Sequence, residues 1–197
     1  MRGCWIDEGS VADESKLPRY GVNMPAFSIR EATTTRQYLA ALRGMGFAPA
    51  IYAAWNWYPN DDGPEFADRI SGFLAERFPA TGTTFPTVCV DIETHDVDYI
   101  LGFLDRWRRL RPARVTAWTL EGFQGGLFNE YARQKIIEAK VAIVPQFYKG
   151  DMTPQPAGVI QDLVAHGFPR QLLHGFYDAA TVQEPWDGYL FTQGRLP

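Results

Sequence analysis

The chain has 197 residues, which suits a single domain, spanning 1–197, with a hydrophobic core of its own. Its composition, 46% hydrophobic and 21% charged, is ordinary for a soluble globular protein. The net charge is −4, and there is no basic patch and no run of 18 apolar residues, so the sequence argues against a nucleic-acid partner and a membrane span.

The N-terminal stretch MRGCWIDEGS has no apolar segment after its single Arg, so we do not expect it to be a signal peptide. We expect synthesis in the cytoplasm, and release by lysis or incorporation into a particle would leave no mark on the sequence. The two cysteines, Cys4 and Cys89, lack metal-ligand spacing, and we expect them to be reduced core residues in strands.

Short apolar segments recur along the chain and predict eight β-strands. In chain order these are Gly3–Asp7, Gly21–Met24, Ala48–Ala53, Thr87–Glu93, Arg114–Leu120, Lys140–Phe147, Leu172–Asp178 and Gly188–Gln193.

Amphipathic segments between several of these strands predict helices. In the segment that begins at Pro64, proline suits the first turn, and Phe66, Ile70 and Leu74 share one stripe. Gly167 is a stop signal after the last helix. The predicted helices are Thr34–Met45, Pro64–Phe78, Asp96–Leu110, Asn129–Ala139 and Ala157–His166.

Strands that alternate with helices of this length indicate βαβ units and a parallel sheet. Eight strands favour a compact α/β barrel of the TIM-like (β/α)8 type, and an open α/β sheet is the alternative. Typical barrels of this type need about 250 residues, so some helices must be short or missing.

The fourth predicted strand, VCVDIE, carries two carboxylates. Because side chains alternate along a strand, its β-branched face would pack under the helices, while Cys89, Asp91 and Glu93 would point into the barrel. The two acids come last on that face, at the carboxyl end where barrel active sites are built.

The same alternation places Asp7, at the end of the first strand, near the barrel mouth. Several acids close together raise one another's proton affinity, which keeps a carboxyl group protonated near neutral pH. The alternative is that Asp91 and Glu93 only cap a helix or pair with Arg. Thr94 and Asp96 are better placed for capping, because they directly precede the helical pattern.

The chain contains an ordered set of motifs: WID (5–7), IYAAW (51–55), PTVCVDIE (86–93) and YLFTQ (189–193). In this order they resemble the glycoside hydrolase family 25 lysozymes, which are compact barrels that cleave peptidoglycan. The resemblance implies a muramidase-like glycosidase that acts on N-acetylated glycan strands. The chain is also similar to the divergent members of this family that phages encode, in lysis cassettes or as virion parts.

The sequence departs from that family in two places. AWTLEGFQGG (117–126) adds Glu121 near the mouth, and IVPQFYKGDM (143–152) replaces the usual end of the sixth strand.

Glycosidic cleavage needs an acid that protonates the leaving oxygen and a negative group that supports the transition state. We expect Glu93 to be the general acid/base, Asp91 to raise its proton affinity or orient the substrate, and Asp7 to complete the acidic floor. The spacing leaves a nucleophilic, a water-mediated and a substrate-assisted route open, and the resemblance favours attack by the substrate's acetamido oxygen.

Further residues are candidates for binding the glycan. Aromatic side chains could stack on sugar rings or fill the core, and residues at strand ends could bind hydroxyl groups. The aromatic candidates are Tyr52, Trp55, Trp57 and Trp118; those near strand ends are Gln146, Tyr148 and Asp178; Glu121 is a second acid or an ion-pair partner.

Two other readings stay open. A metal site could use Asp91, Glu93 and His95, but no further histidine has ligand spacing with them, so we expect neither metal nor cofactor. The main rival is a non-catalytic barrel, a structural or carbohydrate-binding component of a phage particle that contacts other virion proteins. An open mouth long enough for a glycan would favour the enzyme, whereas a mouth plugged by the 55–63 loop, WNWYPNDDG, or by another chain would favour the non-catalytic barrel.

Overall fold

The computed structural model describes residues 2–6, 17–28, 43–48, 50–77, 87–92, 94, 96–110, 116–120, 129–140, 142–145, 156–178 and 188–192. Within these ranges, strand segments such as 116–120 and 188–192 are described by their backbone alone.

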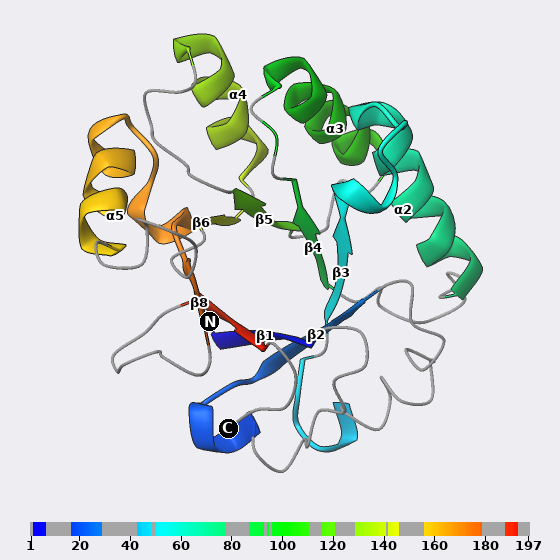
Figure 1. Cartoon of the computed structure of the whole chain (residues 1–197), viewed down its shortest axis with the longest axis vertical. Helices are drawn as coiled ribbons and strands as arrows, with labels where there is room; N and C mark the ends of the chain where they lie inside the picture. Colours follow the sequence, from blue (N-terminus) through cyan, green and yellow to red (C-terminus); the bar gives the residue numbers. More distant parts are fainter. Residues whose placement is uncertain are drawn as a thin grey trace.

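Eight parallel strands form one sheet in the order β6-β5-β4-β3-β2-β1-β8-β7, with the strands arranged around a centre in Figure 1. Strands that are neighbours in the chain pair with each other from β1 to β6, β7 pairs with β8, and β1 also pairs with β8, as in a (β/α)8 arrangement. The fold is therefore the α/β type that the alternating pattern predicts. The strands are β1 Arg2–Ile6, β2 Met24–Ser28, β3 Ala50–Ala54, β4 Thr87–Asp91, β5 Thr116–Leu120, β6 Ala142–Pro145, β7 Gly175–Asp178 and β8 Gly188–Thr192.

The two outer strands of this order, β6 and β7, meet through a short seam. Ile143 of β6 forms an isolated parallel bridge with Leu173, which precedes β7. The backbone N–H of His174 donates to the Ile143 carbonyl oxygen at 2.9 Å. The sheet is thus joined end to end by a bridge rather than by a long ladder.

Four helices lie along one side of the ring of strands in Figure 1. They follow β3, β4, β5 and β6 and confirm four of the five predicted helices within one residue at their described ends. Most of the fifth, Thr34–Met45, lies outside the described residues. The helices are α2 Gly63–Arg77, α3 Val97–Leu110, α4 Glu130–Ala139 and α5 Pro156–Ala165.

The sequence places the second strand at Gly21–Met24, but the strand runs from Met24 to Ser28. Gly21 has φ +65° and belongs to a turn after a short 3-10 helix, Leu17–Tyr20. Pro25 is tolerated inside the strand because pairing with β3 begins only at Ala26, so the missing N–H falls where β2 has one neighbour.

The buried side chains form two separate cores, one on each face of the sheet. The helix-side core joins the apolar stripes of the helices to one face of the strands, including Val88, Val90 and Ile92 of β4 and its extension. The barrel-interior core consists of Met24, Ala26, Ala50, Tyr52, Cys89 and Val144. Val88 and Cys89 thus belong to different cores, which confirms the predicted alternation along β4.

Both cysteines are buried and not disulfide-bonded, as predicted, but they lie in different cores. Cys4 belongs to the helix-side core and Cys89 to the barrel interior. Burial raises the pKa of the Cys4 thiol to about 12, so this thiol stays neutral and unreactive in the folded protein.

Helices α2 and α3 pack closely because small residues lie where they meet. A Cβ atom on Gly63 would overlap the Tyr99 carbonyl oxygen and lie 2.7 Å from the Phe103 nitrogen. Beyond this contact the rings of Phe66 and Phe103 lie 5.6 Å apart, and Phe103 stacks on Trp107 at 5.9 Å. The spacing between the two helices is therefore set at Gly63.

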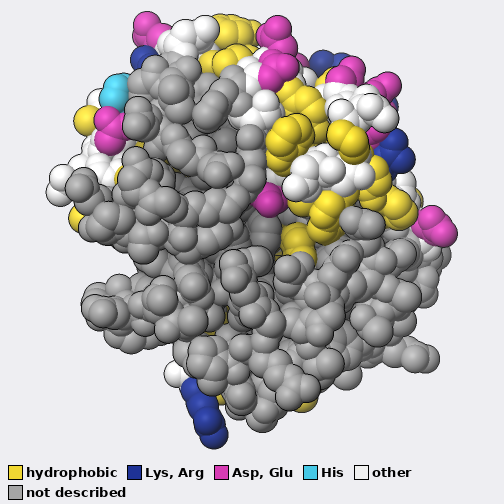
Figure 2. Space-filling view, viewed as in Figure 1, with side chains coloured by type: hydrophobic (Ala, Val, Ile, Leu, Met, Phe, Trp, Pro, Cys, Tyr) yellow, Lys and Arg dark blue, Asp and Glu magenta, His cyan; other side chains and the backbone are white. Residues whose placement is uncertain are grey.

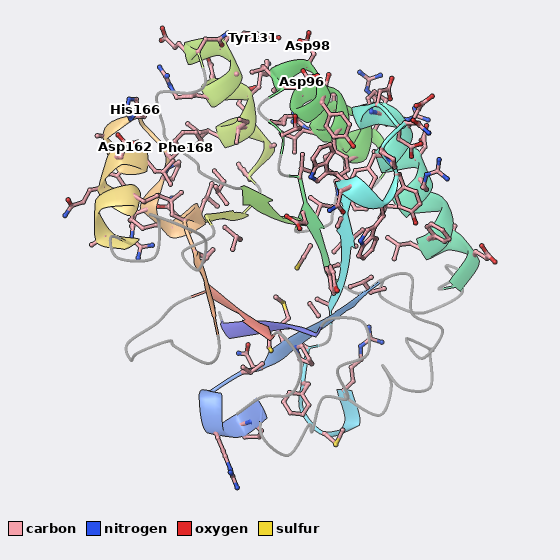
Figure 3. The ribbon with its side chains drawn as sticks, in the orientation of Figure 1. Asp96, Asp98, Tyr131, Asp162, His166 and Phe168 are labelled. Atoms are coloured by element: carbon pink, nitrogen blue, oxygen red, sulfur yellow. The ribbon has the colours of Figure 1, made fainter. Side chains whose placement is uncertain are left out.

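The ends of α4 and α5 carry capping residues, and the one after α5 is the predicted stop signal Gly167. Asn129 caps α4 by accepting the Ala132 N–H at 2.8 Å. After α5, Gly167 adopts φ +89°, and the Phe168 N–H donates to the Leu163 carbonyl at 3.1 Å. This Schellman arrangement turns the Phe168 ring into the helix-side core beside α5 (Figure 3).

Candidate functional site at the carboxyl ends of the strands

The candidate site begins with Asp91, the last residue of β4. It follows Cys89 by two residues on the face that forms the barrel interior, and it is half-buried. In register it pairs with Ala54, the last residue of β3, and with Thr119 of β5. The chain therefore holds a carboxylate at the mouth end of the barrel interior, flanked by two strands with small or uncharged residues.

Capping of the following helix is carried out by other residues. Asp96 Oδ1 accepts the backbone N–H groups of Asp98 and Tyr99 at 2.9 and 3.2 Å, at the start of α3 (Figure 3). Thr94 Oγ1 accepts the Asp96 N–H at 3.1 Å. The sequence predicts both as the capping residues, so Asp91 is not needed at the helix N-terminus.

The other acids assigned to the mouth lie outside the described residues. These are Asp7, Glu93 and Glu121. Their assignments as acidic floor, acid/base and second acid stay predictions, and Asp91 is the proposed catalytic acid whose burial the structure describes.

The loop after β3 carries three aromatic residues that diverge. A single 3-10 turn, Trp55–Trp57, directly follows Ala54. Trp55 is half-buried against α3, with its ring 6.3 Å from that of Tyr99 and nearly perpendicular to it. Trp57 instead packs on Tyr52, at 5.6 Å, and touches both cores. Hydrophobic side chains gather at the surface in this region, near α2 and α3 (Figure 2).

A charged clamp holds this loop against α2. Arg69 binds both carboxylate oxygens of Asp61, at 2.5 and 2.7 Å, and its guanidinium lies 4.6 Å from the centre of the Tyr58 ring. The hydrogen bond from Arg69, and then its charge, hold the pKa of the Asp61 carboxyl below its usual range. Asp61, Arg69 and Tyr58 therefore act as one unit.

A reciprocal capping box lies beside the clamp. Asp62 Oδ1 accepts the Glu65 N–H at 2.8 Å, and Glu65 Oε2 accepts the Asp62 N–H at 3.0 Å. The β3–α2 loop is thus fixed at its α2 end by two sets of charge-assisted hydrogen bonds. The sequence signal for the box, DDGPE, is local, whereas the clamp joins residues eight positions apart and has no such local signal.

Tyr99, in the first turn of α3, contacts Trp55 of the β3–α2 loop. Its hydroxyl group is buried and has no hydrogen-bond partner among the described residues. Burial, followed by the nearby charges of Asp61 and Asp62, raises the pKa of this phenol above its usual range. Tyr99 therefore stays neutral and serves as packing surface for Trp55.

Of the remaining predicted binding residues, three lie in described strands and two lie outside the described residues. Tyr52 is only 5% exposed and forms part of the barrel-interior core. On β5, Trp118 pairs with Val90, and it is Thr119 that pairs with Asp91. Asp178 is the last residue of β7, at the mouth end, whereas Gln146 and Tyr148 lie outside the described residues. Their binding roles stay predictions.

Within the described ranges, no group of three metal-ligating side chains comes together. The hypothetical ligands Glu93 and His95 lie outside those ranges. Among the described helices, none has the length and apolar character needed to span a membrane.

Comparison with known proteins identifies the fold. No family model and no curated protein sequence matches the chain. Among solved structures, a candidate alpha-L-fucosidase from Bacteroides thetaiotaomicron is similar, with a TM-score of 0.58, 11% identity, and coverage of 96% of this chain and 86% of that one.

Two plant proteins are also similar. The chitinase ICChI from Ipomoea carnea has a TM-score of 0.51 and 12% identity. A chitinase-like lectin from tamarind has a TM-score of 0.52 and 9% identity. Each comparison covers 97% of this chain and 93% of the other. At these identities the likeness shows a shared fold over nearly the whole chain.

Proposed function

We propose that this chain is a glycosidase-like barrel that cleaves N-acetylated glycan strands of the peptidoglycan type. The observation that carries the proposal is Asp91, a half-buried carboxylate on the interior face at the carboxyl end of β4. Barrel enzymes place their catalytic groups at this end. The fold shared with a chitinase and a candidate fucosidase supports a carbohydrate substrate.

In this proposal Glu93 is the general acid/base. The sequence predicts that it follows Asp91 on the same strand face, and two such residues are about 7 Å apart at Cα. A carboxylate at that distance raises the proton affinity of its neighbour, which keeps Glu93 protonated until it donates to the leaving oxygen. Asp91 then supports the positive charge that develops on the sugar or on its acetamido group, and Asp7 adds to the same field.

Cleavage assays with matched variants test this proposal. Wild-type protein is incubated with purified peptidoglycan and with β-1,4-linked N-acetylglucosamine oligomers, and both turbidity loss and new reducing ends are measured. We expect activity in the wild type and a loss of at least about a hundredfold in Glu93→Gln, as for removal of a general acid. Equal activity in the two proteins would refute Glu93 as the general acid, and no activity of the wild type on any glycan would refute catalysis.

Asp91→Asn is the second arm of the assay. If Asp91 raises the proton affinity of Glu93, removing its charge lowers the pKa of Glu93 and shifts the alkaline limb of the pH–rate profile to lower pH. A merely structural role for Asp91 would lower the activity without moving that limb.

A non-catalytic carbohydrate-binding function is the second candidate. It is favoured by the likeness to the tamarind chitinase-like lectin, in which the same fold belongs to a protein described as a lectin. In this case the chain would bind glycan as part of a phage particle, in contact with other virion proteins. Glycan binding without any new reducing ends would identify it.

A further inference from the structure

We infer that Trp57 is the platform on which a pyranose ring of the bound glycan stacks. This inference rests on the proposed carbohydrate function, in either its catalytic or its binding form, and it assigns the stacking surface to one residue of the β3–α2 loop.

Trp57 follows the strand that pairs with the strand of Asp91. It lies three residues after Ala54, which pairs with Asp91 across β3 and β4. Trp57 also packs on Tyr52 at 5.6 Å, and Tyr52 belongs to the same interior core as Cys89, two residues before Asp91. The indole therefore lies at the mouth end of the strand next to the carboxylate, over the interior of the barrel.

The three aromatic side chains of the β3–α2 loop point in different directions. Trp55 turns toward α3 and meets Tyr99. Tyr58 turns toward α2, where its ring lies 6.1 Å from Phe66 and under the guanidinium of Arg69. Trp57 is the member of the set that touches the barrel-interior core, and it keeps part of its surface in solvent. A half-buried indole that follows β3, the strand paired with the one that bears Asp91, offers an apolar face to the C–H groups of a sugar ring.

Backbone hydrogen bonds and an ion pair hold the β3–α2 loop in place. The Tyr58 N–H donates to the Trp55 carbonyl at 3.0 Å and the Asp61 N–H to the Tyr58 carbonyl at 3.1 Å, so Trp57 is enclosed between backbone turns. The Asp61–Arg69 clamp then ties the loop to α2. An aromatic surface that is already ordered in the free protein avoids the entropic cost of ordering on binding.

Calorimetric titration tests this inference. The probe is the tetramer of β-1,4-linked N-acetylglucosamine, and all proteins carry Glu93→Gln so that the probe stays intact during the measurement. We expect Trp57→Ala to raise Kd about tenfold, as for the loss of one aromatic contact, and Trp57→Phe to raise it less. Tyr131→Ala is the control, because that ring is 64% exposed on α4.

The outcomes separate the inference from the function. The parent protein is the one that carries Glu93→Gln alone. If it binds the tetramer and adding Trp57→Ala leaves Kd unchanged, Trp57 is not the stacking platform, and the carbohydrate function stays in place. If neither the parent nor the wild type binds the tetramer or peptidoglycan, the function falls and the platform falls with it. If Trp57→Ala does not fold, Trp57→Phe against Trp57→Leu decides, because equal affinities for the two would show that an aromatic face is not used.

Discussion

The close approach of α2 and α3 makes a sharp prediction for Gly63. Replacing it with Ala introduces a Cβ that overlaps the Tyr99 carbonyl oxygen and lies 2.7 Å from the Phe103 nitrogen. Both are backbone atoms of α3, so they cannot rotate away, and the helices must separate. Overpacking of this kind costs about 1–3 kcal/mol.

Gly72 provides a matched control in the same helix. It lies in the middle of α2 and is exposed, and a Cβ atom added there would meet no other atom within 4 Å. Gly72→Ala should therefore stabilise the protein by about 0.5–1 kcal/mol, because alanine restricts the unfolded chain and favours helix. The two substitutions are chemically identical and are expected to have opposite signs.

Thermal and urea unfolding measure the difference. The gap between the two variants should be about 1.5–4 kcal/mol, which corresponds to about 3–16 °C in Tm for a domain of this size. If Gly63→Ala is as stable as Gly72→Ala, the helices do not meet as described. Gly63→Ala should also weaken glycan binding, since Gly63 directly follows the loop that holds Trp57, whereas Gly72→Ala should leave it unchanged.

Further predictions concern helix ends, the loop clamp and a buried thiol. Asp96→Ala removes the α3 cap and should cost about 1 kcal/mol in urea unfolding; no loss would show that water replaces the cap. Gly167→Ala forces alanine to φ +89° and should cost about 1–2 kcal/mol by the same assay, with an unchanged midpoint counting against the Schellman turn. Because the pKa of Asp61 is lowered in the folded state, its pairing with Arg69 stabilises the protein above the unfolded pKa of about 4 and is lost as pH falls through the folded value. The stability difference between wild type and Asp61→Asn, about 0.5 kcal/mol at neutral pH, should thus vanish in acid, and a difference that grows in acid would contradict the clamp. Cys4 should react with a thiol reagent only after denaturation, and fast labelling of the native protein would disprove its burial.

Alternation along the strands predicts the two-core arrangement because it depends only on a period of two. The assignment of Val88 and Val90 to the helices and of Cys89 to the barrel interior requires no knowledge of neighbouring strands. The helix caps Asp96 and Asn129 are equally local, since the bonds they make reach only two or three residues along the chain.

Features that depend on partners across a turn or between strands are beyond the reach of such local patterns. The predicted second strand, Gly21–Met24, is wrong at both ends, because the strand runs through Pro25, which is tolerated there since β3 has not yet begun to pair. The Arg69–Asp61 clamp needs the loop to fold back along α2, and nothing in the residue types alone indicates that geometry. For the same reason the sequence names four aromatic candidates for the site but does not distinguish the directions that Trp55 and Trp57 take.

The bridge between Ile143 and Leu173 determines where the barrel opens locally most easily. Every other junction in the sheet is a ladder of three or more paired residues, whereas in the described chain this junction has one bridge and the 2.9 Å bond from His174 to Ile143. Local opening is cheapest where the fewest backbone bonds must break. Deuterium should therefore enter the His174 amide sooner than the amides of β3 and β4, and an opened seam would expose two unpaired strand edges to a neighbouring molecule. If the chain is divided between β6 and β7, we expect the two fragments, β1–β6 and β7–β8, to reassemble, because few backbone bonds join them at this seam.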